Sequence, residues 1–394
     1  MRKHIKLQRI FIYNGVIYVI GRVKMKLISI RKTAVSVLVT LLFVSVVGVS
    51  IGAGNNHSLN QAESISDWYD LEDIRDDLSA DYVLTDDLTE DIDGYSEFID
   101  TDEGWYPIGN DTDPFTGTFD GNGYQIKDLY INRSEMDDVG LFGSIDGAEI
   151  TDLGLVDADI SGVSLVGGLV GSNSGTVENS YASGNVNGTG HSSGGLIGWN
   201  DGTVMNSFAA SDLSGSIDVG GLIGSNDGMV ENSYATGGVS GWSRVGGLIG
   251  YNDEGTVESS YAAGGVAGTT EGGLIGRNDA TVSNSYWDID TSGMNTSAGG
   301  TGLPTVEMTG GNAPNNLDGF DFVDTWETVN EGDDDADEDG YPVLQVISRK
   351  EQLEHVYPSE DEVEMPEIDI PGFTSILLLI ATVAAVAIYG KKKQ

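Results

Sequence analysis

Residues 167–181 read GGLVGSNSGTVENSY, and four close copies of this segment follow along the chain. The copies are GGLIGWNDGTVMNSF (194–208), GGLIGSNDGMVENSY (220–234), GGLIGYNDEGTVESSY (246–261) and GGLIGRNDATVSNSY (272–286). The second glycine recurs after 27, 26, 26 and 26 residues, and a weaker copy begins at Gly140. A fixed period of this length indicates a repeat array, in which each unit stacks on its neighbours.

Each unit consists of short β-type pieces separated by turn residues, with no helix-length apolar face. This pattern predicts one coil of a right-handed parallel β-helix, a solenoid of about 26-residue coils. Successive coils stack about 4.8 Å apart, so equivalent residues form columns. We expect three inward columns: Leu169, Leu196, Leu222, Leu248 and Leu274; Val177, Val204, Val230, Val257 and Val282; and Tyr181, Phe208, Tyr234, Tyr261 and Tyr286. The column Val170, Ile197, Ile223, Ile249 and Ile275 stays ambiguous, because strict alternation turns it outward whereas a corner folds it inward.

A row of asparagines lies between the valine and aromatic columns. Its members are Asn179, Asn206, Asn232 and Asn284, and Ser259 interrupts it. Asparagine tolerates the left-handed conformation of a sharp corner, and stacked amides can bond along the axis. We therefore predict a structural row, with a catalytic asparagine row as the alternative.

The start of the chain has the order of a secretory signal. Residues 1–53 carry nine Lys or Arg and no acid, and Lys26, Arg31 and Lys32 precede an apolar run. We expect an upstream extension at 1–24 and a signal peptide at 25–53, with an uncleaved anchor as the alternative. A polar linker (54–65) then leads to a short capping helix and strand within 66–84. The chain has no cysteine, so disulfides do not stabilise the product.

The other end of the chain changes composition twice. Residues 66–347 hold the predicted β-helix, and 348–370 are acidic and read as an extended spacer. The segment 371–394 places Pro371, Gly372 and Phe373 before an apolar run and three lysines. It predicts a C-terminal hydrophobic helix with a cytoplasmic basic end, and a plain tail anchor is one interpretation.

Taken together, these motifs resemble two known signatures. The segment FTGTFDGNGYQIKDLYI (115–131), the five GGLIG units and the closing SYWDIDTSGMNTSAGG (285–300) resemble the GLUG-repeat family of exported proteins. That resemblance implies a β-helical stalk or display surface on the cell, and it carries no catalytic residues over to this chain. The C-terminal order resembles the archaeal PGF-type sorting signal. It implies that an archaeosortase cuts near Pro371 and joins the new end to a membrane lipid.

Charge is distributed unevenly along the chain. All 62 acidic residues and only seven of the basic ones fall within 54–370, a net charge of about −55. Such a surface excludes nucleic-acid binding, which requires Lys and Arg at the phosphates. It suits a protein kept soluble in strong salt, and with the archaeal-type tail it indicates a halophilic archaeon. N-glycosylation sequons of the exported region begin at Asn56, Asn110, Asn132, Asn187 and Asn295.

The coils suggest two weak binding features. Asp201, Asp227, Asp253 and Asp279 would recur at every coil, so their mutual repulsion calls for structural calcium or high salt. Trp199 and Tyr251 share one outward column two coils apart, a spacing of roughly 10 Å at which both rings could stack on sugars. Two calcium-loop beginnings, at Asp288 and Asp335, lack the acid required at the twelfth position, which is Gly299 or Val346.

The sequence predicts a non-catalytic protein without a cofactor. We expect an exported envelope component or adhesin, anchored to the membrane through its C-terminus, whose partners are cell-envelope components or surface glycans. The alternative is a β-helical polysaccharide lyase or glycoside hydrolase, which needs an activated base or paired carboxylates. The few basic residues, including Arg244 and Arg277, read as scattered along the coils, and no coil departs from the others.

Overall fold

A computed structural model describes residues 62–99, 101–331, 333 and 340–356. The predicted segments 1–24, 25–53 and 371–394, including Pro371, Gly372 and Phe373, lie outside these residues, as does Asn56. In the part described, no helix has the length and apolar character needed to span a membrane.

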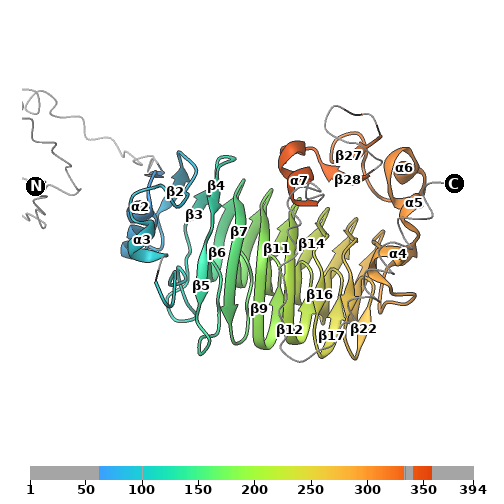
Figure 1. Cartoon of the computed structure of the whole chain (residues 1–394), viewed down its shortest axis with the longest axis horizontal. Coiled ribbons are helices and arrows are strands. Elements are labelled where there is room, and N and C mark those ends of the chain that lie inside the picture. The colour runs from blue at the N-terminus through green and yellow to red at the C-terminus, as the bar shows by residue number, and fades with distance from the viewer. Residues whose placement is uncertain (1–61, 100, 332, 334–339, 357–394) are drawn as a thin grey trace, which may run out of the picture. The chain divides into compact units, whose positions relative to one another are not determined.

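Parallel strands stack into one solenoid, which confirms the predicted β-helix (Figure 1). It has about six turns. One sheet runs in the order β1 (Glu63–Ile65), β2 (Asp81–Leu84), β3 (Thr118–Asp120), β6 (Phe142–Thr151), β8 (Val170–Glu178), β10 (Ile197–Asn200), β13 (Ile223–Asn226), β18 (Ile249–Asn252) and β23 (Ile275–Asn278), and it continues sideways through β11 (Thr203–Met205), β14 (Met229–Glu231), β19 (Thr256–Glu258) and β24 (Thr281–Ser283).

The second sheet closes the coil on the other side. Its strands are β4 (Gln125–Lys127), β5 (Tyr130–Asn132), β7 (Gly154–Gly162), β9 (Tyr181–Gly194), β12 (Phe208–Gly220), β15 (Tyr234–Ala235), β16 (Val239–Ser240), β17 (Ser243–Gly246), β20 (Tyr261–Ala262), β21 (Val266–Ala267), β22 (Glu271–Gly272), β25 (Tyr286–Asp288) and β26 (Thr301–Leu303). The parallel pairing ends at β26, so the solenoid stops before the predicted boundary at 347.

The interior of the solenoid contains the predicted leucine and valine columns. All five leucines and the four valines from Val177 to Val257 are buried, and Val282 is half-buried at the C-terminal end. The ambiguous column from Val170 to Ile275 is buried too, because the chain turns at the preceding leucine. This corner needs glycine: a Cβ on Gly221 would lie 2.1 Å from Gly247 O of the next coil.

Polar ladders hold the corners. Asn179, Asn206, Asn232, Ser259 and Asn284 all have φ between 46° and 52°, as predicted for a left-handed corner row. Asn206 Nδ2 donates to Asn179 Oδ1 at 3.3 Å. A second ladder, which was not predicted, passes amide hydrogen bonds of 2.6–2.8 Å along the axis through Asn173, Asn200, Asn226, Asn252 and Asn278. The first four of these asparagines are fully buried, and Asn278 at the end is half-buried.

The aromatic column does not point inward, and this part of the prediction is wrong. After the left-handed corner residue, Ser180 is buried and its Oγ donates to Glu178 O, so alternation turns Tyr181 outward and Ala182 inward. Tyr181, Phe208, Tyr234 and Tyr261 stack on the outside with centroids 4.8–4.9 Å apart. We call these four rings and Tyr286 the aromatic ladder.

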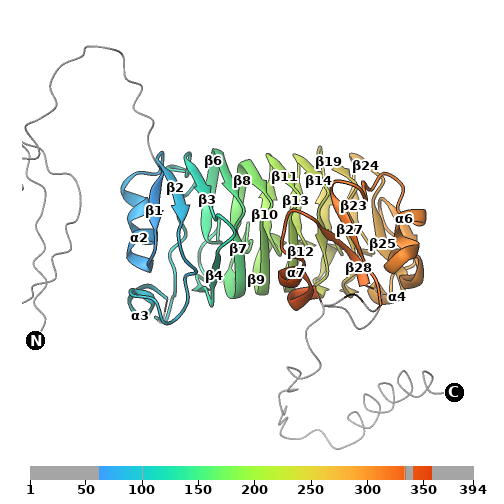
Figure 2. The same ribbon diagram turned by 90° about the horizontal axis from the view of Figure 1, so that it is seen from above.

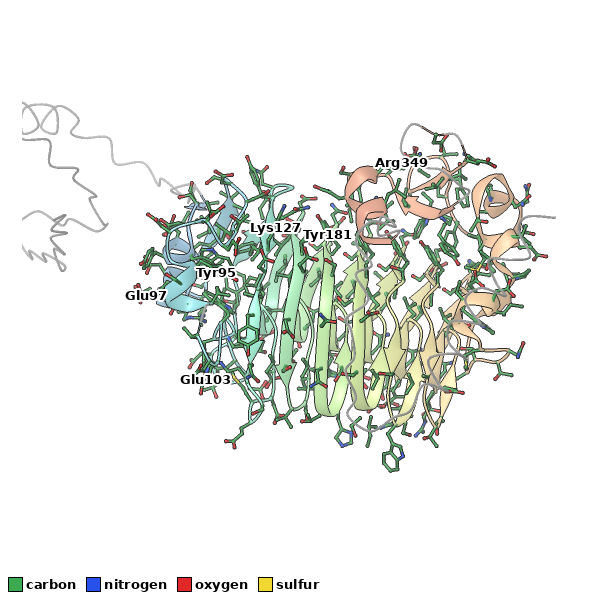
Figure 3. All side chains as sticks on the ribbon, in the orientation of Figure 1. Tyr95, Glu97, Glu103, Lys127, Tyr181 and Arg349 are labelled. Atoms are coloured by element: carbon green, nitrogen blue, oxygen red, sulfur yellow. The ribbon has the colours of Figure 1, made fainter. Side chains whose placement is uncertain are left out.

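Residues 304–356 fold back along the solenoid and cover this ladder (Figure 2). We call this segment the strap. It contains α5 (Thr305–Met308), η2 (Gly310–Asn312), α6 (Ala313–Asn316), the antiparallel pair β27 (Trp326–Val329) and β28 (Gly340–Leu344), and α7 (Arg349–Val356). The predicted spacer from 348 therefore begins with a helix. Figure 3 shows Tyr181 and Arg349 on the same edge of the molecule.

Buried hydrogen bonds fasten the strap. Gln352 is fully buried; its Oε1 accepts from Tyr234 Oη at 3.0 Å, and its Nε2 donates to Leu344 O at 2.7 Å. Tyr261 Oη donates to Pro342 O at 2.8 Å. Asp288, one of the calcium-loop aspartates, accepts from Tyr341 Oη at 2.6 Å and caps α4 (Ile289–Ser292), so it serves the fold.

The N-terminal end is capped as predicted. Helix α2 (Trp68–Asp73) starts at Asp67, whose Oδ1 accepts from Tyr69 N and Asp70 N, and it continues into η1 (Ile74–Asp76). Trp68, Leu71 and Ile74 are fully buried against the first coils, near α3 (Tyr95–Phe98). Strand β1 falls in the last residues of the predicted linker, where it pairs with β2.

Candidate functional site: an aromatic and arginine strip

One outward column of the solenoid carries chemistry that differs from coil to coil. The pairing register aligns Ser172, Trp199, Ser225, Tyr251 and Arg277 along β8, β10, β13, β18 and β23. We call Trp199, Ser225, Tyr251 and Arg277, together with Arg244, the strip. The predicted pair of Trp199 and Tyr251 thus lies in one column, with the small Ser225 between the rings.

Trp199 is fixed in position by a carboxylate of the next coil. Its Nε1 donates to Asp227 Oδ2 at 2.8 Å, so the indole reaches over the coil that carries Ser225. Ser225 points outward and is nevertheless only 9% exposed, which indicates that neighbouring side chains cover it. Trp199 itself stays half-buried.

Tyr251 is surrounded by charge. The guanidinium carbons of Arg244 and Arg277 each lie 4.8 Å from its ring centroid. Its hydroxyl lies 2.5 Å from Asp253 Oδ1 and 3.0 Å from Asp279 Oδ2, and these hydrogen bonds raise the pKa of Tyr251. Tyr251 therefore stays protonated at neutral pH. Because both guanidinium groups occupy its ring, Trp199 is the ring better placed to stack on a sugar.

Arg244 also neutralises a buried acid. Its Nε and Nη2 lie 2.6 Å and 2.7 Å from the two carboxylate oxygens of Asp218, which is 4% exposed. Burial raises the pKa of Asp218, and Arg244 opposes that shift. His191 Nδ1 lies 3.9 Å from the same carboxylate. The carboxylate of Asp218 is thus buried and paired with a guanidinium.

The basic residues of the middle coils lie close together and are not scattered, which differs from the expectation. Between residues 134 and 303 the sequence contains only His191, Arg244 and Arg277 as basic residues, and all three lie around Asp218 and Tyr251. Projecting each residue onto the coil register would have revealed this, because Arg244 and Asp218 occupy equivalent positions in adjacent coils.

The predicted aspartate column accepts side-chain hydrogen bonds. Trp199 donates to Asp227, Tyr251 contacts Asp253 and Asp279, and Arg277 Nη2 lies 2.5 Å from Asp279 Oδ2. The hydrogen bond from Arg277 lowers the pKa of Asp279. Asp201 is exposed. Across the residues that the structure describes, no three Asp, Glu or His side chains gather as metal ligands.

Changing Asp201, Asp227, Asp253 and Asp279 to Asn is expected to reduce the dependence of Tm on salt. Salt screens the repulsion between like charges in adjacent coils, and the variant has less repulsion to screen. Because protein donors already serve three of the four carboxylates, we expect a modest reduction. Thermal unfolding across salt concentrations measures it. The control changes Glu178, Glu231 and Glu258, on another outward column, to Gln; equal slopes in both variants would assign the aspartates no special role.

The predicted sequons differ in accessibility. Asn132, Asn187 and Asn295 are exposed, whereas Asn110 is half-buried and its Oδ1 accepts from Thr112 N and Asp113 N. Asn110 also lines a shallow cavity of about 540 Å³ at the N-terminal cap, together with Arg75 and Tyr106.

The coils are similar in sequence to known proteins. Residues 162–187 and 215–240 match a family model described as the GLUG motif. Two coils carry the GLUG motif. A stretch of 144 residues, 36% of the chain, is 38% identical to halomucin of Haloquadratum walsbyi. A stretch of 134 residues, 33% of the chain, is 32% identical to a candidate Gly-rich membrane protein of Evansella cellulosilytica. These matches span only 2% and 15% of the two relatives.

One solved structure has a similar fold. It is that of a candidate immunoglobulin A1 protease from Bacteroides ovatus, with a TM-score of 0.57 over 73% of this chain and 93% of that one. The two sequences are 20% identical, so the likeness concerns the fold alone.

Proposed function

We propose that the chain is a non-catalytic cell-surface protein of a halophile, an envelope component or adhesin held at the membrane through its C-terminal segment. The proposal that the protein is non-catalytic rests on the hydrogen bonds and ion pairs made by the strip residues. The strip residues Arg244, Arg277, Trp199 and Tyr251 engage the carboxylates beside them, and Tyr251 has a raised pKa. These carboxylates belong to Asp218, Asp227, Asp253 and Asp279. The similarity to halomucin and the net charge of about −55 between residues 54 and 370 support the surface of a halophile.

Protease treatment of intact cells tests the location. We expect peptides from residues 62–356 to be released before lysis, because the solenoid would face the medium. A cytoplasmic protein of the same cells serves as the control. Protection of these peptides until lysis would contradict the proposal, and depolymerisation of a polysaccharide by the purified protein would contradict the non-catalytic part.

As an adhesin, the protein would bind neutral surface glycans through the strip. Trp199→Ala is expected to weaken that binding about three- to tenfold, because aromatic contacts contribute about 0.5–1.5 kcal/mol beyond the area they bury. Glycan arrays followed by titration calorimetry measure the change. The matched control is Trp242→Ala, which removes a tryptophan that is 65% exposed and lies outside the strip. Equal losses in both variants would place the binding elsewhere.

A further inference from the structure

The cavity of about 540 Å³ at the N-terminal cap, near α2, lies between two segments of the chain (Figure 1). One wall comes from η1 and the turn that follows it, and the other comes from the loop 106–116. At one end Arg75 Nη1 donates to Pro107 O at 2.8 Å. At the other end Thr116 N donates to Leu78 O at 2.8 Å. Because hydrogen bonds join the walls at both ends, the cavity is built into the fold.

Tyr106 lines this cavity and is 49% exposed. It also lines a neighbouring cavity of about 250 Å³. The guanidinium groups of Arg75 and Arg133 donate to the four consecutive carbonyls of residues 104–107, and the two bonds from Arg133 measure 3.0 and 3.3 Å. The backbone that carries the exposed ring is therefore fixed, which lowers the entropy cost of binding a ligand there.

The ring of Tyr106 is more open than that of Tyr251 in the strip. The guanidinium carbons of Arg75 and Arg133 lie 5.6 and 5.1 Å from its centroid, whereas both arginines at Tyr251 lie at 4.8 Å. Tyr251 is half-buried, whereas Tyr106 is exposed. Tyr106 therefore keeps accessible ring area for a ligand.

Three polar side chains of the cavity have hydrogen-bonding capacity to spare. Asn110 Oδ1 accepts from Thr112 N and Asp113 N at 2.9 and 3.1 Å, which fixes the amide group. Its Nδ2 has no hydrogen-bond partner among the residues that the structure describes, and the exposed carboxylates of Asp76 and Asp113 accept no hydrogen bond from those residues. The cavity thus offers a donating amide and two accepting carboxylates beside an aromatic ring.

These groups match the chemistry of a neutral sugar. Sugar hydroxyls donate to carboxylates and accept from an amide, and the C–H face of the sugar packs on an aromatic ring. An anionic sugar would be repelled, because the carboxylates of Asp76, Asp77 and Asp113 line the cavity. Arg75 does not offset them, since its Nε lies 2.9 Å from Glu72 Oε2 and its other nitrogens serve backbone carbonyls.

We propose that this cavity, which we call the cap site, binds a neutral sugar. The sugar stacks on Tyr106, donates hydrogen bonds to Asp76 and Asp113, and accepts one from Asn110 Nδ2. The cap site shares no residue with the strip, so it is a second glycan site and does not depend on binding at Trp199.

Titration calorimetry in molar KCl with neutral hexasaccharides of glucose, mannose and galactose, and with hexasaccharides of their uronic acids, tests the proposal. Trp199→Ala serves as the parent protein, so that the strip does not contribute to the signal. The neutral chains are expected to bind and the uronic acids to fail. Tyr106→Ala is expected to weaken binding about three- to tenfold. Asn110→Asp keeps the acceptor oxygen of the turn and removes only the donor, and it is expected to weaken binding about tenfold.

Trp242→Ala is the control, because it removes an aromatic side chain that is 65% exposed and lies outside the cavity. It should keep the parent affinity. Parent affinity in both Tyr106→Ala and Asn110→Asp would overturn the proposal, as would uronic acids that bind more tightly than the neutral chains, or no binding of any neutral chain. A glycan found on Asn110 of the native protein by mass spectrometry would also overturn it, since that glycan would fill the cavity.

Discussion

Asn226→Asp is expected to lower the free energy of unfolding at neutral pH by about 3–5 kcal/mol, the cost of an uncompensated buried charge. Asn226 is fully buried in the middle of the amide ladder. Its Nδ2 donates to Asn252 Oδ1 at 2.8 Å and to Gly228 O at 3.2 Å. A carboxylate in that place would face two acceptor oxygens, with only Asn200 Nδ2, 2.7 Å from Oδ1, as a donor.

The loss in the free energy of unfolding of Asn226→Asp should grow as pH rises. Burial raises the pKa of the new carboxyl in the folded state above its unfolded value of about 4, so the folded variant binds the proton more tightly. The variant is therefore closest to wild type at acid pH and loses stability as pH rises from about 4 to the folded pKa. Urea unfolding at several pH values measures this.

The control lies in the same coil. Asn232→Asp puts the same charge at the left-handed corner, where Asp152 occupies the equivalent position with φ 52°. It should cost little, because that corner is half-buried and tolerates aspartate. If Asn226→Asp is as mild as Asn232→Asp, the amide ladder does not stabilise the solenoid as we argue.

Trp326→Ala is expected to release the strap, at a cost of about 3–5 kcal/mol for the lost indole. Trp326 is fully buried, with its ring 5.8 Å from that of Tyr261 and 4.7 Å from that of Phe320. Hydrogen exchange should accelerate across residues 304–356 while the amides of the inner strands stay protected, because the described residues of the strap add no strand to the two solenoid sheets.

Val323→Ala is the control, since this strap residue is 80% exposed and its truncation removes little contact. Equal acceleration in strap and coils would mean that the two unfold as one unit. That outcome would contradict a separately removable strap.

The repeated part of the fold could be predicted because the same type of residue recurs at the equivalent position in five successive coils. The leucine and valine columns and the left-handed asparagine corner follow from spacing and residue type. The outward direction of the Tyr181 side chain could not be predicted from the sequence. It depends on how one corner shifts the alternation of inward and outward side chains. The strap has no period, and its contacts join residues far apart in sequence, such as Tyr234 and Gln352.

The strip, too, could be predicted from the sequence only in part. Spacing alone put Trp199 and Tyr251 in one column, and the register confirms that alignment. The two arginines over Tyr251 are 33 residues apart in sequence, and only the coil register together with their side-chain conformations brings them to one ring. The predicted sorting motif and signal peptide stay predictions.

With the C-terminal anchoring proposed above, mechanical load would enter the molecule through the strap. Helix α7 is joined to the flank of the solenoid by Gln352 and Tyr234, well away from the last coil at β26. The polypeptide continues beyond α7, so tension on that continuation pulls sideways on the strap. Peeling breaks the strap contacts one after another, whereas separating stacked coils would break many parallel hydrogen bonds at once. We therefore expect the strap to yield first under such load and to uncover the aromatic ladder, while the coils keep their shape.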